Sequence, residues 1–158
     1  MVNIVLARID DRLIHGQVMT TWVKYLQGNR IVIVDDGVAK DPFLVKIMKM
    51  AAPSGITAEI FRTQEAIGIL KKDAVPGEKV IILAKSPITL YDLMQGGVVL
   101  DKINVGGMGA CAGRKPLYKN ISASAEEKEV FKKILDLGVK VTMQIVPDEK
   151  EVAIDKFL

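Results

Sequence analysis

The chain alternates short apolar runs with segments whose apolar residues recur at helical spacing, and this alternation most constrains its fold. It is typical of βαβ units, in which helices connect the parallel strands of one sheet. The apolar runs cover residues 2–7, 30–34, 56–61, 79–84, 102–105 and 140–146. The helical segments cover about 16–27, 42–51, 63–72, 87–94 and 125–137. We predict an α/β fold with an open, mainly parallel twisted sheet of about six or seven strands and helices on both faces. At this length we expect a single domain over residues 1–158.

Local signals refine where these helices begin and end. Asp41 before Pro42 is a strong helix start, and the capping box at 124–127 is another. Gly28 and Gly138 should end the helices that precede them. In the segment 42–51 the inward face should consist of Leu44, Ile47, Met48 and Ala51.

The apolar runs also differ in the position that they predict. Run 56–61 alternates and should lie near a sheet edge, whereas run 79–84 is wholly apolar and should be central. Run 140–146 should be the last strand, and the tail 148–158 should form a short helix. The glycine-rich segment after residue 105 should continue as a loop through Pro116.

Composition excludes several classes of function. Cys111 and His15 are the only residues of their types, so neither a disulfide within the chain nor a Cys/His zinc site is expected. The net charge of +3 is too small to indicate nucleic-acid binding. We find neither a signal peptide nor an uncharged apolar run of about 18 residues, the length of a membrane helix. We therefore expect a cytoplasmic protein without metal, cofactor or nucleic acid, and docking onto a membrane protein stays open.

Polar residues follow several predicted strands. Ligands of open parallel sheets bind at the carboxyl ends of the strands, so these residues should meet at one rim. They are the segment Arg8–His15, the pair Asp35-Asp36, the pair Lys85-Ser86 and the pair Gly106-Gly107. Asp35 and Asp36 fit either of two roles, orienting Arg12 or binding Mg²⁺, although aspartates at strand ends more often cap turns.

The segment 7–18, ARIDDRLIHGQV, carries the strongest chemistry. His15 precedes the predicted start of a helix, where unpaired backbone N–H groups favour an anion. Two arginines beside it suit phosphate oxygens, and this cationic setting should keep the imidazole neutral and nucleophilic. One of two aspartates should accept the N–H of the other ring nitrogen. The candidate phosphate-binding residues are Arg12, Arg8, Gly16 and Gln17, and the candidate supporting residues are Asp10, Asp11, Asp35, Ser86 and Gly107. The sequence leaves open whether Arg8 contacts phosphate or only supports the loop.

A second motif, VGGMGACAG at 105–113, leaves an alternative open. It matches the relaxed dinucleotide fingerprint only weakly, because it lies late in the chain and runs into Pro116 rather than into a helix. The alternative to a phosphoryl carrier is a non-enzymatic module that binds a nucleotide or phosphate through Gly106–Gly109. A regulatory homologue without transfer activity is a third hypothesis. Cys111 is expected to be a small loop residue, since no second histidine exists to activate it.

The segment RIDDRLIHGQV closely resembles the active-site loop of the enzyme IIB subunits of the bacterial sugar phosphotransferase system, mannose/fructose/sorbose type. Further segments resemble the family in order and spacing, so that the resemblance covers the chain from Ile4 to about Val146. They are IVIVDDGVAKD, AAPSGITAEIF, GEKVIIL, MQGGV and INVGGMG.

The resemblance implies a mechanism and a set of partners. The histidine that matches His15 is phosphorylated at Nδ1 by the phosphohistidine of a IIA protein or domain. It then passes the group to a sugar bound by the membrane subunits IIC and IID. The chain would then be a cytoplasmic protein-phosphohistidine–sugar phosphotransferase, peripherally associated with those subunits and without a cofactor. The sequence leaves a homodimer open, and it does not identify the sugar among mannose, fructose, sorbose and amino sugars such as N-acetylgalactosamine.

Overall fold

A computed structural model describes all 158 residues. The main sheet has seven strands in the order β3-β2-β4-β1-β5-β8-β9, and a separate hairpin consists of β6 and β7. The strands are β1 Ile4–Asp10, β2 Arg30–Val34, β3 Thr57–Phe61, β4 Val80–Ala84, β5 Lys102–Gly107, β6 Lys115–Tyr118, β7 Ile121–Ala123, β8 Lys140–Met143 and β9 Val152–Ala153. The helices are α1 Gly16–Leu26, α2 Asp36–Ala39, α3 Pro42–Ala51, α4 Thr63–Leu70, α5 Pro87–Gln95 and α6 Ala125–Asp136, followed by a 3₁₀ turn at Ile154–Phe157.

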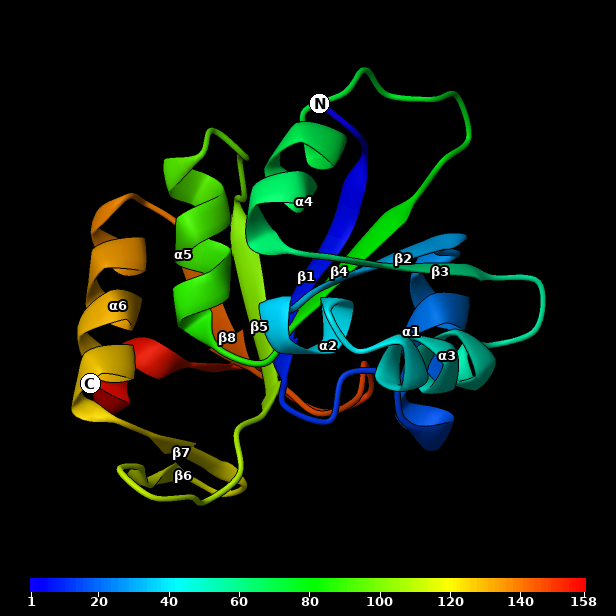
Figure 1. Ribbon diagram of the computed structural model, residues 1–158. Helices are drawn as coiled ribbons and strands as arrows, with labels where there is room; N and C mark the ends of the chain where they lie inside the picture. The colour runs from blue at the N-terminus through cyan, green and yellow to red at the C-terminus, as the bar shows by residue number, and fades with distance from the viewer.

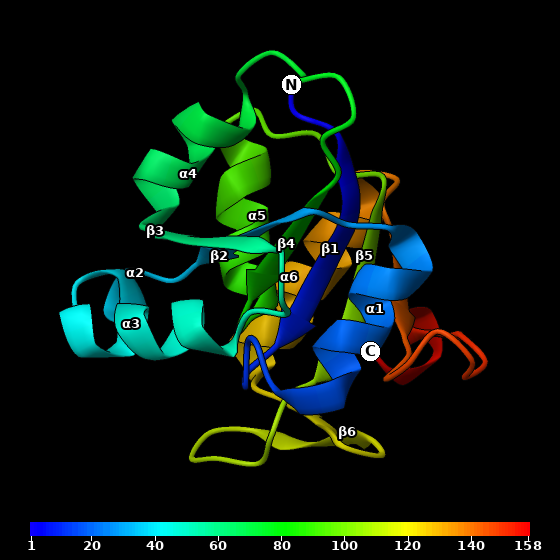
Figure 2. The same ribbon diagram turned by 90° about the vertical axis from the view of Figure 1, so that its right-hand side faces the viewer.

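Helices cover both faces of the sheet, as predicted. Helices α4, α5 and α6 lie on one face, and α1 and α3 lie on the other (Figures 1 and 2). Successive side chains of β2 point to opposite faces of the sheet, so this one strand contributes to the apolar layers on both faces. Val32 and Val34 point into the larger apolar cluster with α4, α5 and α6, whereas Ile31 and Ile33 point into the smaller cluster with α1.

Strand β1 lies at the centre of the sheet between β4 and β5, and all its pairings are parallel. Its residues alternate in the same way. Ala7 and Ile9 belong to the larger apolar cluster, so Arg8 and Asp10 face the α1 side of the sheet. We expected this strand to end near residue 7, but it continues to Asp10. The extension places two charged side chains inside the protein.

The strand positions agree with expectation in the first part of the chain and depart from it later. Strand β3 is an edge strand and β4 is internal, as predicted. Strand β8 is not the last strand, because the tail adds β9 antiparallel to it. The expected loop through Pro116 is partly the β6–β7 hairpin. Helix α1 ends at Gln27, which adopts the left-handed conformation with φ 55° that we expected of Gly28.

The predicted helix starts are present. Asp41 caps α3 by accepting from the N–H groups of Phe43 and Leu44. Ser124 and Glu127 cap α6 reciprocally, each side chain accepting from the other residue's backbone N–H. The predicted inward face of α3 is only partly correct. Leu44 and Met48 pack on the smaller apolar cluster, whereas Ile47 and Ala51 are exposed.

None of the helices combines the length and the apolar content that crossing a bilayer requires.

The capping box of α6 gives a test of the fold. Replacing Ser124 by alanine leaves the N–H of Glu127 without its acceptor, so we expect Ser124→Ala to lower the free energy of unfolding by about 1 kcal/mol. Urea denaturation measures this change. Ser54→Ala, at an exposed turn residue, is the matched control and should unfold like the wild type. Identical midpoints for both variants would show that the cap contributes nothing.

Candidate functional site

His15 lies between β1 and α1, where it is the N-cap residue of the helix. The connecting loop is anchored from below, because Leu13 and Ile14 are buried in the smaller apolar cluster. Leu13 has φ 58°, a conformation that residues other than glycine rarely adopt. Two buried side chains therefore hold a strained turn in place and fix the backbone that carries the imidazole.

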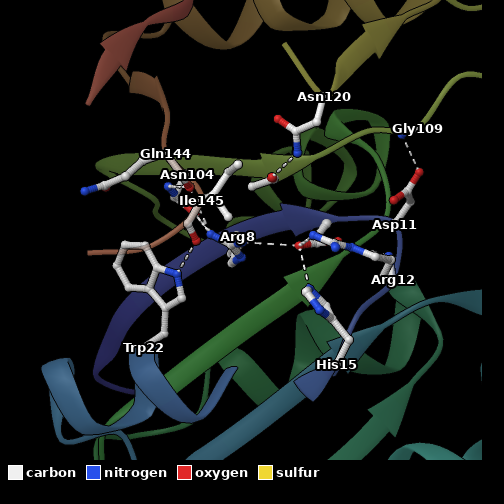
Figure 3. A network of polar contacts seen from close by, with 12 residues as sticks. Arg8, Asp11, Arg12, His15, Trp22, Asn104, Gly109, Asn120, Gln144 and Ile145 are labelled. Carbon is white, nitrogen blue, oxygen red and sulfur yellow. Dashed lines mark hydrogen bonds and ion pairs between the residues drawn. The ribbon is translucent and has the colours of Figure 1, made fainter. Parts of the chain in front are cut away.

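The ring of His15 is oriented by Asp10. Nε2 lies 3.0 Å from Oδ2 of Asp10, which is fully buried (Figure 3). Burial alone would raise the pKa of Asp10, but hydrogen bonds from Arg12 and His15 and the charge of Arg8 outweigh it and hold that pKa below its ordinary value. Asp10 is therefore a carboxylate and can only accept, so Nε2 carries the proton. Of the two candidate aspartates, Asp10 supports the histidine.

The other ring nitrogen is free. Nδ1 of His15 has no hydrogen-bond partner within the protein. It is not one of the buried side-chain polar atoms that lack a partner, which are Nε of Arg8 and Oγ1 of Thr142. Nδ1 therefore reaches solvent, although only 21% of the side chain is exposed. A neutral imidazole with its proton on Nε2 presents the lone pair of Nδ1, so this atom is the nucleophile that the geometry provides.

The N-terminus of α1 beside this nitrogen is open to an anion. No side chain caps the helix, and its first turn contains no acidic residue. Gly16 has φ 45°, and a Cβ built there meets nothing within 4 Å. The backbone N–H groups of the first turn are thus unobstructed, and the helix dipole adds to their attraction for negative charge. Gln17 lies in this turn and is exposed.

Arg8 does not lie where a phosphate ligand must lie, and this corrects the sequence-based expectation. Its side chain is fully buried, so it cannot contact a group on the surface of the loop. Its guanidinium donates to Oδ1 of Asn104 at 2.6 Å, to the carbonyl of Gln144 at 3.1 Å and to Asp10 at 3.2 Å. It also lies 5.4 Å from the ring centre of Trp22, which is buried. Arg8 supports Asp10 from beneath.

The two glycines at the end of β5 make room for these charged groups. A Cβ at Gly106 would overlap the guanidinium of Arg8. A Cβ at Gly107 would lie 3.4 Å from Arg12 and Asp10, at the limit of ordinary contact. Gly106 and Gly107 are therefore strand residues that admit buried charge, rather than parts of a phosphate-binding loop.

Arg12 is the arginine that reaches the surface, with 51% of its side chain exposed. Its Nε and Nη2 donate to the two oxygens of Asp10, both at 3.1 Å, and its backbone N–H donates to the same carboxylate. These bonds raise the pKa of Arg12, although burial opposes them. Asp10 thus holds Arg12 and His15 side by side, and Arg12 keeps a donor edge for an incoming anion.

Asp11 has a different task from Asp10. Its Oδ2 accepts from the N–H of Gly109 at 2.6 Å and from Arg114 at 3.4 Å. Arg114 makes a two-pronged ion pair with Glu127, with both contacts at 2.9 Å. Burial would raise the pKa of Glu127, but the bonds from Arg114 and the cap at Ser124 lower it. Asp11 fastens the glycine-rich segment to the histidine loop and does not touch the imidazole.

The remaining predicted residues have structural contacts. Asp35 caps α2 through the N–H of Val38 and pairs with Lys85 at 3.8 Å, so it does not orient Arg12. Ser86 caps α5 through the N–H of Ile88. These contacts show that the strand ends meet at one rim, as expected, although only the end of β1 surrounds His15.

The alternative based on Gly106–Gly109 lacks the geometry that it needs. After β5 the chain enters the β6–β7 hairpin, so no helix N-terminus follows the glycines. Cys111 is exposed in this connection. A dinucleotide fingerprint depends on such a helix for its pyrophosphate, and the structure therefore gives no support to this reading.

Sequence reasoning missed the residues that surround Arg8 and Asp11. Trp22 donates its indole N–H to the carbonyl of Ile145 at 2.9 Å, and Asn104 donates to the carbonyl of Gln144 (Figure 3). The alternation of Ala7, Arg8, Ile9 and Asp10 was the available signal, because it continues the period of β1 through two charged residues. The contacts of Asn104, Gln144 and Arg114 join residues that are far apart in the sequence, so they leave no local pattern.

Fold and site together define an α/β protein that can use a histidine nucleophile, at the carboxyl edge of the sheet, on an anionic electrophile. The chain matches the family model described as PTS system sorbose subfamily IIB component over residues 4–158. A sorbose-specific EIIB component from Lacticaseibacillus casei is 39% identical over 143 residues, which are 90% of this chain and 87% of that protein. An N-acetylgalactosamine-specific phosphotransferase enzyme IIB component 2 from Escherichia coli K12 is 35% identical over 100% of both chains.

Solved structures agree with this result. The crystal structure of the IIBSor domain of the sorbose permease from Klebsiella pneumoniae superposes with a TM-score of 0.91 at 34% identity, covering 98% of this chain and 95% of that one. The chain belongs to the sorbose-type IIB family of the phosphotransferase system, whose members transfer phosphoryl groups in sugar uptake.

The fit of Gly106 against Arg8 is testable by one methyl group. We expect Gly106→Ala to lower the free energy of unfolding by roughly 1–3 kcal/mol, because a buried guanidinium must move away from the added carbon. Gly68→Ala is the matched control, since a Cβ there meets nothing within 4 Å inside α4, and it should stabilise by about 0.5–1 kcal/mol. Equal effects of the two variants in urea denaturation would contradict this account of Gly106.

The lowered pKa of Asp10 predicts how stability depends on pH. A carboxyl group with a lower pKa in the folded state adds stability above its unfolded pKa, and this stability is lost as pH falls through the folded value. At neutral pH, Asp10→Asn should cost on the order of 3–5 kcal/mol, because Arg8 stays buried without its partner.

The difference between wild type and Asp10→Asn should therefore narrow as the pH falls below about 4. Unfolding free energies measured across this range isolate Asp10, because Glu127 and Glu151, whose pKa values are also lowered, are present in both proteins. A difference that stayed constant with pH would show that Asp10 contributes no charge-dependent stability.

Proposed function

We propose that this chain is a phosphoryl carrier in which Nδ1 of His15 accepts a phosphoryl group from the phosphohistidine of a IIA protein and passes it to a sugar held by IIC and IID membrane subunits. The observation that carries the proposal is the bond from Nε2 of His15 to the buried Asp10 carboxylate. It fixes the tautomer and leaves Nδ1 as the nucleophile beside an uncapped helix N-terminus. The family supports the reaction class, and a fused mannose-specific EIIAB component of Escherichia coli K12, 36% identical over 141 residues, supports contact between IIA and IIB.

In the first transfer, the Nδ1–P bond forms on His15 while the N–P bond of the donor breaks. The lone pair of Nδ1 becomes the new bond, and the electrons of the broken bond return to the donor imidazole. The His15 ring keeps its proton on Nε2 and gains positive charge. The carboxylate of Asp10 stabilises that charge at 3.0 Å without taking the proton.

In the second transfer, a sugar hydroxyl oxygen attacks the phosphorus as the Nδ1–P bond breaks. The hydroxyl proton leaves to a base or to water, and His15 returns to the neutral ring with the proton still on Nε2. The hydrogen bond from Nε2 to Asp10 is kept in both transfers. It holds the imidazole in one orientation with the proton on Nε2, so Nδ1 is the reactive nitrogen in each step.

The transferred group needs positioning and charge stabilisation more than covalent chemistry. The N–H groups of the first turn of α1 and the exposed edge of Arg12 would surround its oxygens. Gly16 would leave the space that those oxygens require. No metal is needed for this arrangement, since the cationic groups come from the protein itself.

The protein would then lie at the cytoplasmic side of its membrane subunits and be peripherally associated with them. The choice of sugar would rest with those subunits, since the contacts of the His15 loop account for a phosphoryl site only. A homodimer stays a prediction from the sequence.

A phosphorylation assay tests the carrier. We expect the wild type, incubated with phosphoenolpyruvate, the general phosphotransferase proteins and a IIA donor, to gain one acid-labile, base-stable phosphoryl group by intact mass. His15→Ala should gain none. Asp10→Asn should be labelled roughly 100-fold more slowly, because an amide holds neither the tautomer nor the developing charge. Phosphorus NMR should place the group on Nδ1.

Lys24→Ala is a useful control on the same helix, since it removes an exposed side chain from the last turn of α1 and keeps the backbone N–H groups of the first turn. It should retain the label. Absence of label on the wild type with several IIA donors, each shown to be phosphorylated, would overturn the carrier. A label on Nε2 would overturn the assigned role of Asp10.

A further inference from the structure

The outer face of α3 carries three large apolar side chains that no other part of the protein covers. Phe43, Ile47 and Met50 are 69%, 39% and 76% exposed. Their spacing of four and three residues places them on one face of the helix, and we call them the α3 stripe. A contiguous exposed apolar patch of this kind marks an interaction site more often than an isolated apolar residue does.

The α3 stripe lies close to the site, because α3 packs on the same apolar cluster as the His15 loop. On the inner side of α3, Leu44 and Met48 pack against the apolar cluster that contains Leu13 and Ile14, the two anchors of the His15 loop. Figures 1 and 2 both place α3 at the edge of the molecule where β1 ends and α1 begins. A protein that reaches His15 from this edge can rest on the stripe at the same time.

Charge narrows the kind of partner. Lys46 and Lys49 lie along one side of the stripe, both are exposed, and neither forms an ion pair. Helix α3 itself contains no acidic residue. The surface is therefore apolar with a cationic rim, and it complements an apolar patch bordered by carboxylates. Two copies of the stripe facing each other would bring the lysines of both copies together without a counter-charge.

We propose that the α3 stripe is the docking surface for the phosphoryl donor, a IIA protein with an apolar contact patch and an acidic border. This rests on the proposed function. The donor arrives with an anionic phosphoryl group and departs without it. The cationic rim therefore binds the loaded donor more tightly than the spent one, and this difference favours release after transfer.

Two double variants test the surface. Phe43→Ser with Met50→Ser should raise the KM for the donor roughly tenfold or more and leave the labelling rate at saturating donor unchanged, because the reacting groups are untouched. Lys46→Glu with Lys49→Glu should also raise the KM for the donor, and that KM should depend less on the salt concentration than it does in the wild type. Both variants change exposed residues, so circular dichroism and thermal unfolding should match the wild type.

Matched controls carry the same chemical changes elsewhere. Val99→Ser with Leu137→Ser removes two exposed apolar side chains far along the chain, at 63% and 58% exposure. Lys72→Glu with Lys128→Glu makes the same charge change just after α4 and on α6, away from α3. Both controls should keep the wild-type KM for the donor.

His15→Ala separates docking from transfer. It keeps the stripe, so it should still bind the IIA donor by calorimetry, more tightly than the stripe variants do, while taking no label. Wild-type binding without any label would overturn the carrier and leave the docking surface standing. Folded stripe variants with an unchanged KM would overturn the docking surface and leave the carrier standing.

Two further results would also overturn the docking surface. One is a loss confined to sugar phosphorylation with membranes that hold IIC and IID, which would assign the stripe to those subunits. The other is a wild-type dimer in sedimentation that the stripe variants dissolve, which would assign it to a second copy of the chain.

Discussion

The buried ion pair between Arg8 and Asp10 is the interaction on which the site depends. A cation and an anion inside a sheet are costly to desolvate, and they are tolerated here because nearly every donor and acceptor has a partner. Asn104, the carbonyl of Gln144 and the ring of Trp22 surround the guanidinium, and Gly106 leaves the room for it. In return, Asp10 is held as an acceptor at a fixed point beneath the histidine. The rest of the site follows from that point, since Asp10 sets the His15 ring and ties down Arg12.

Asp10 and Asp11 are neighbours in the chain, but the geometry of the strand gives them different roles. Asp10 is the last residue of β1 and points to the α1 side, whereas Asp11 begins the loop and points toward the glycine-rich segment. One residue along the chain thus changes the partner from an imidazole to a backbone N–H and a distant arginine. The network of Asp11, Arg114 and Glu127 fixes the start of the β6–β7 hairpin relative to the loop. The imidazole and the glycine-rich segment are therefore held by separate groups that do not compete.

The sequence predicted most of the fold and the identity of the central histidine. Apolar periodicity placed the sheet, the helices on both faces, the edge strand β3 and the caps at Asp41 and Ser124, because each of these depends on residues close in the chain. It failed where position depends on distant contacts. Arg8 was expected among the phosphate-binding residues, and only Asn104, Gln144 and Gly106, which lie on other strands or just after one, make its burial possible. Strand β9 and the β6–β7 hairpin were missed because strands of only two to four residues are too short to show a period.

The support of His15 comes from beneath the surface. This separates the orientation of the reactive histidine from the composition of the exposed surface, two properties that often constrain each other in a small protein. The groups that orient the imidazole are inside the sheet, so exposed residues outside the His15 loop can change without moving the reactive nitrogen. A cell that keeps several such chains could thus diversify their outer faces to prevent cross-talk, while one interior arrangement serves all of them. The interior keeps the orientation of the histidine constant, and the exposed surface can differ between chains to select the partner.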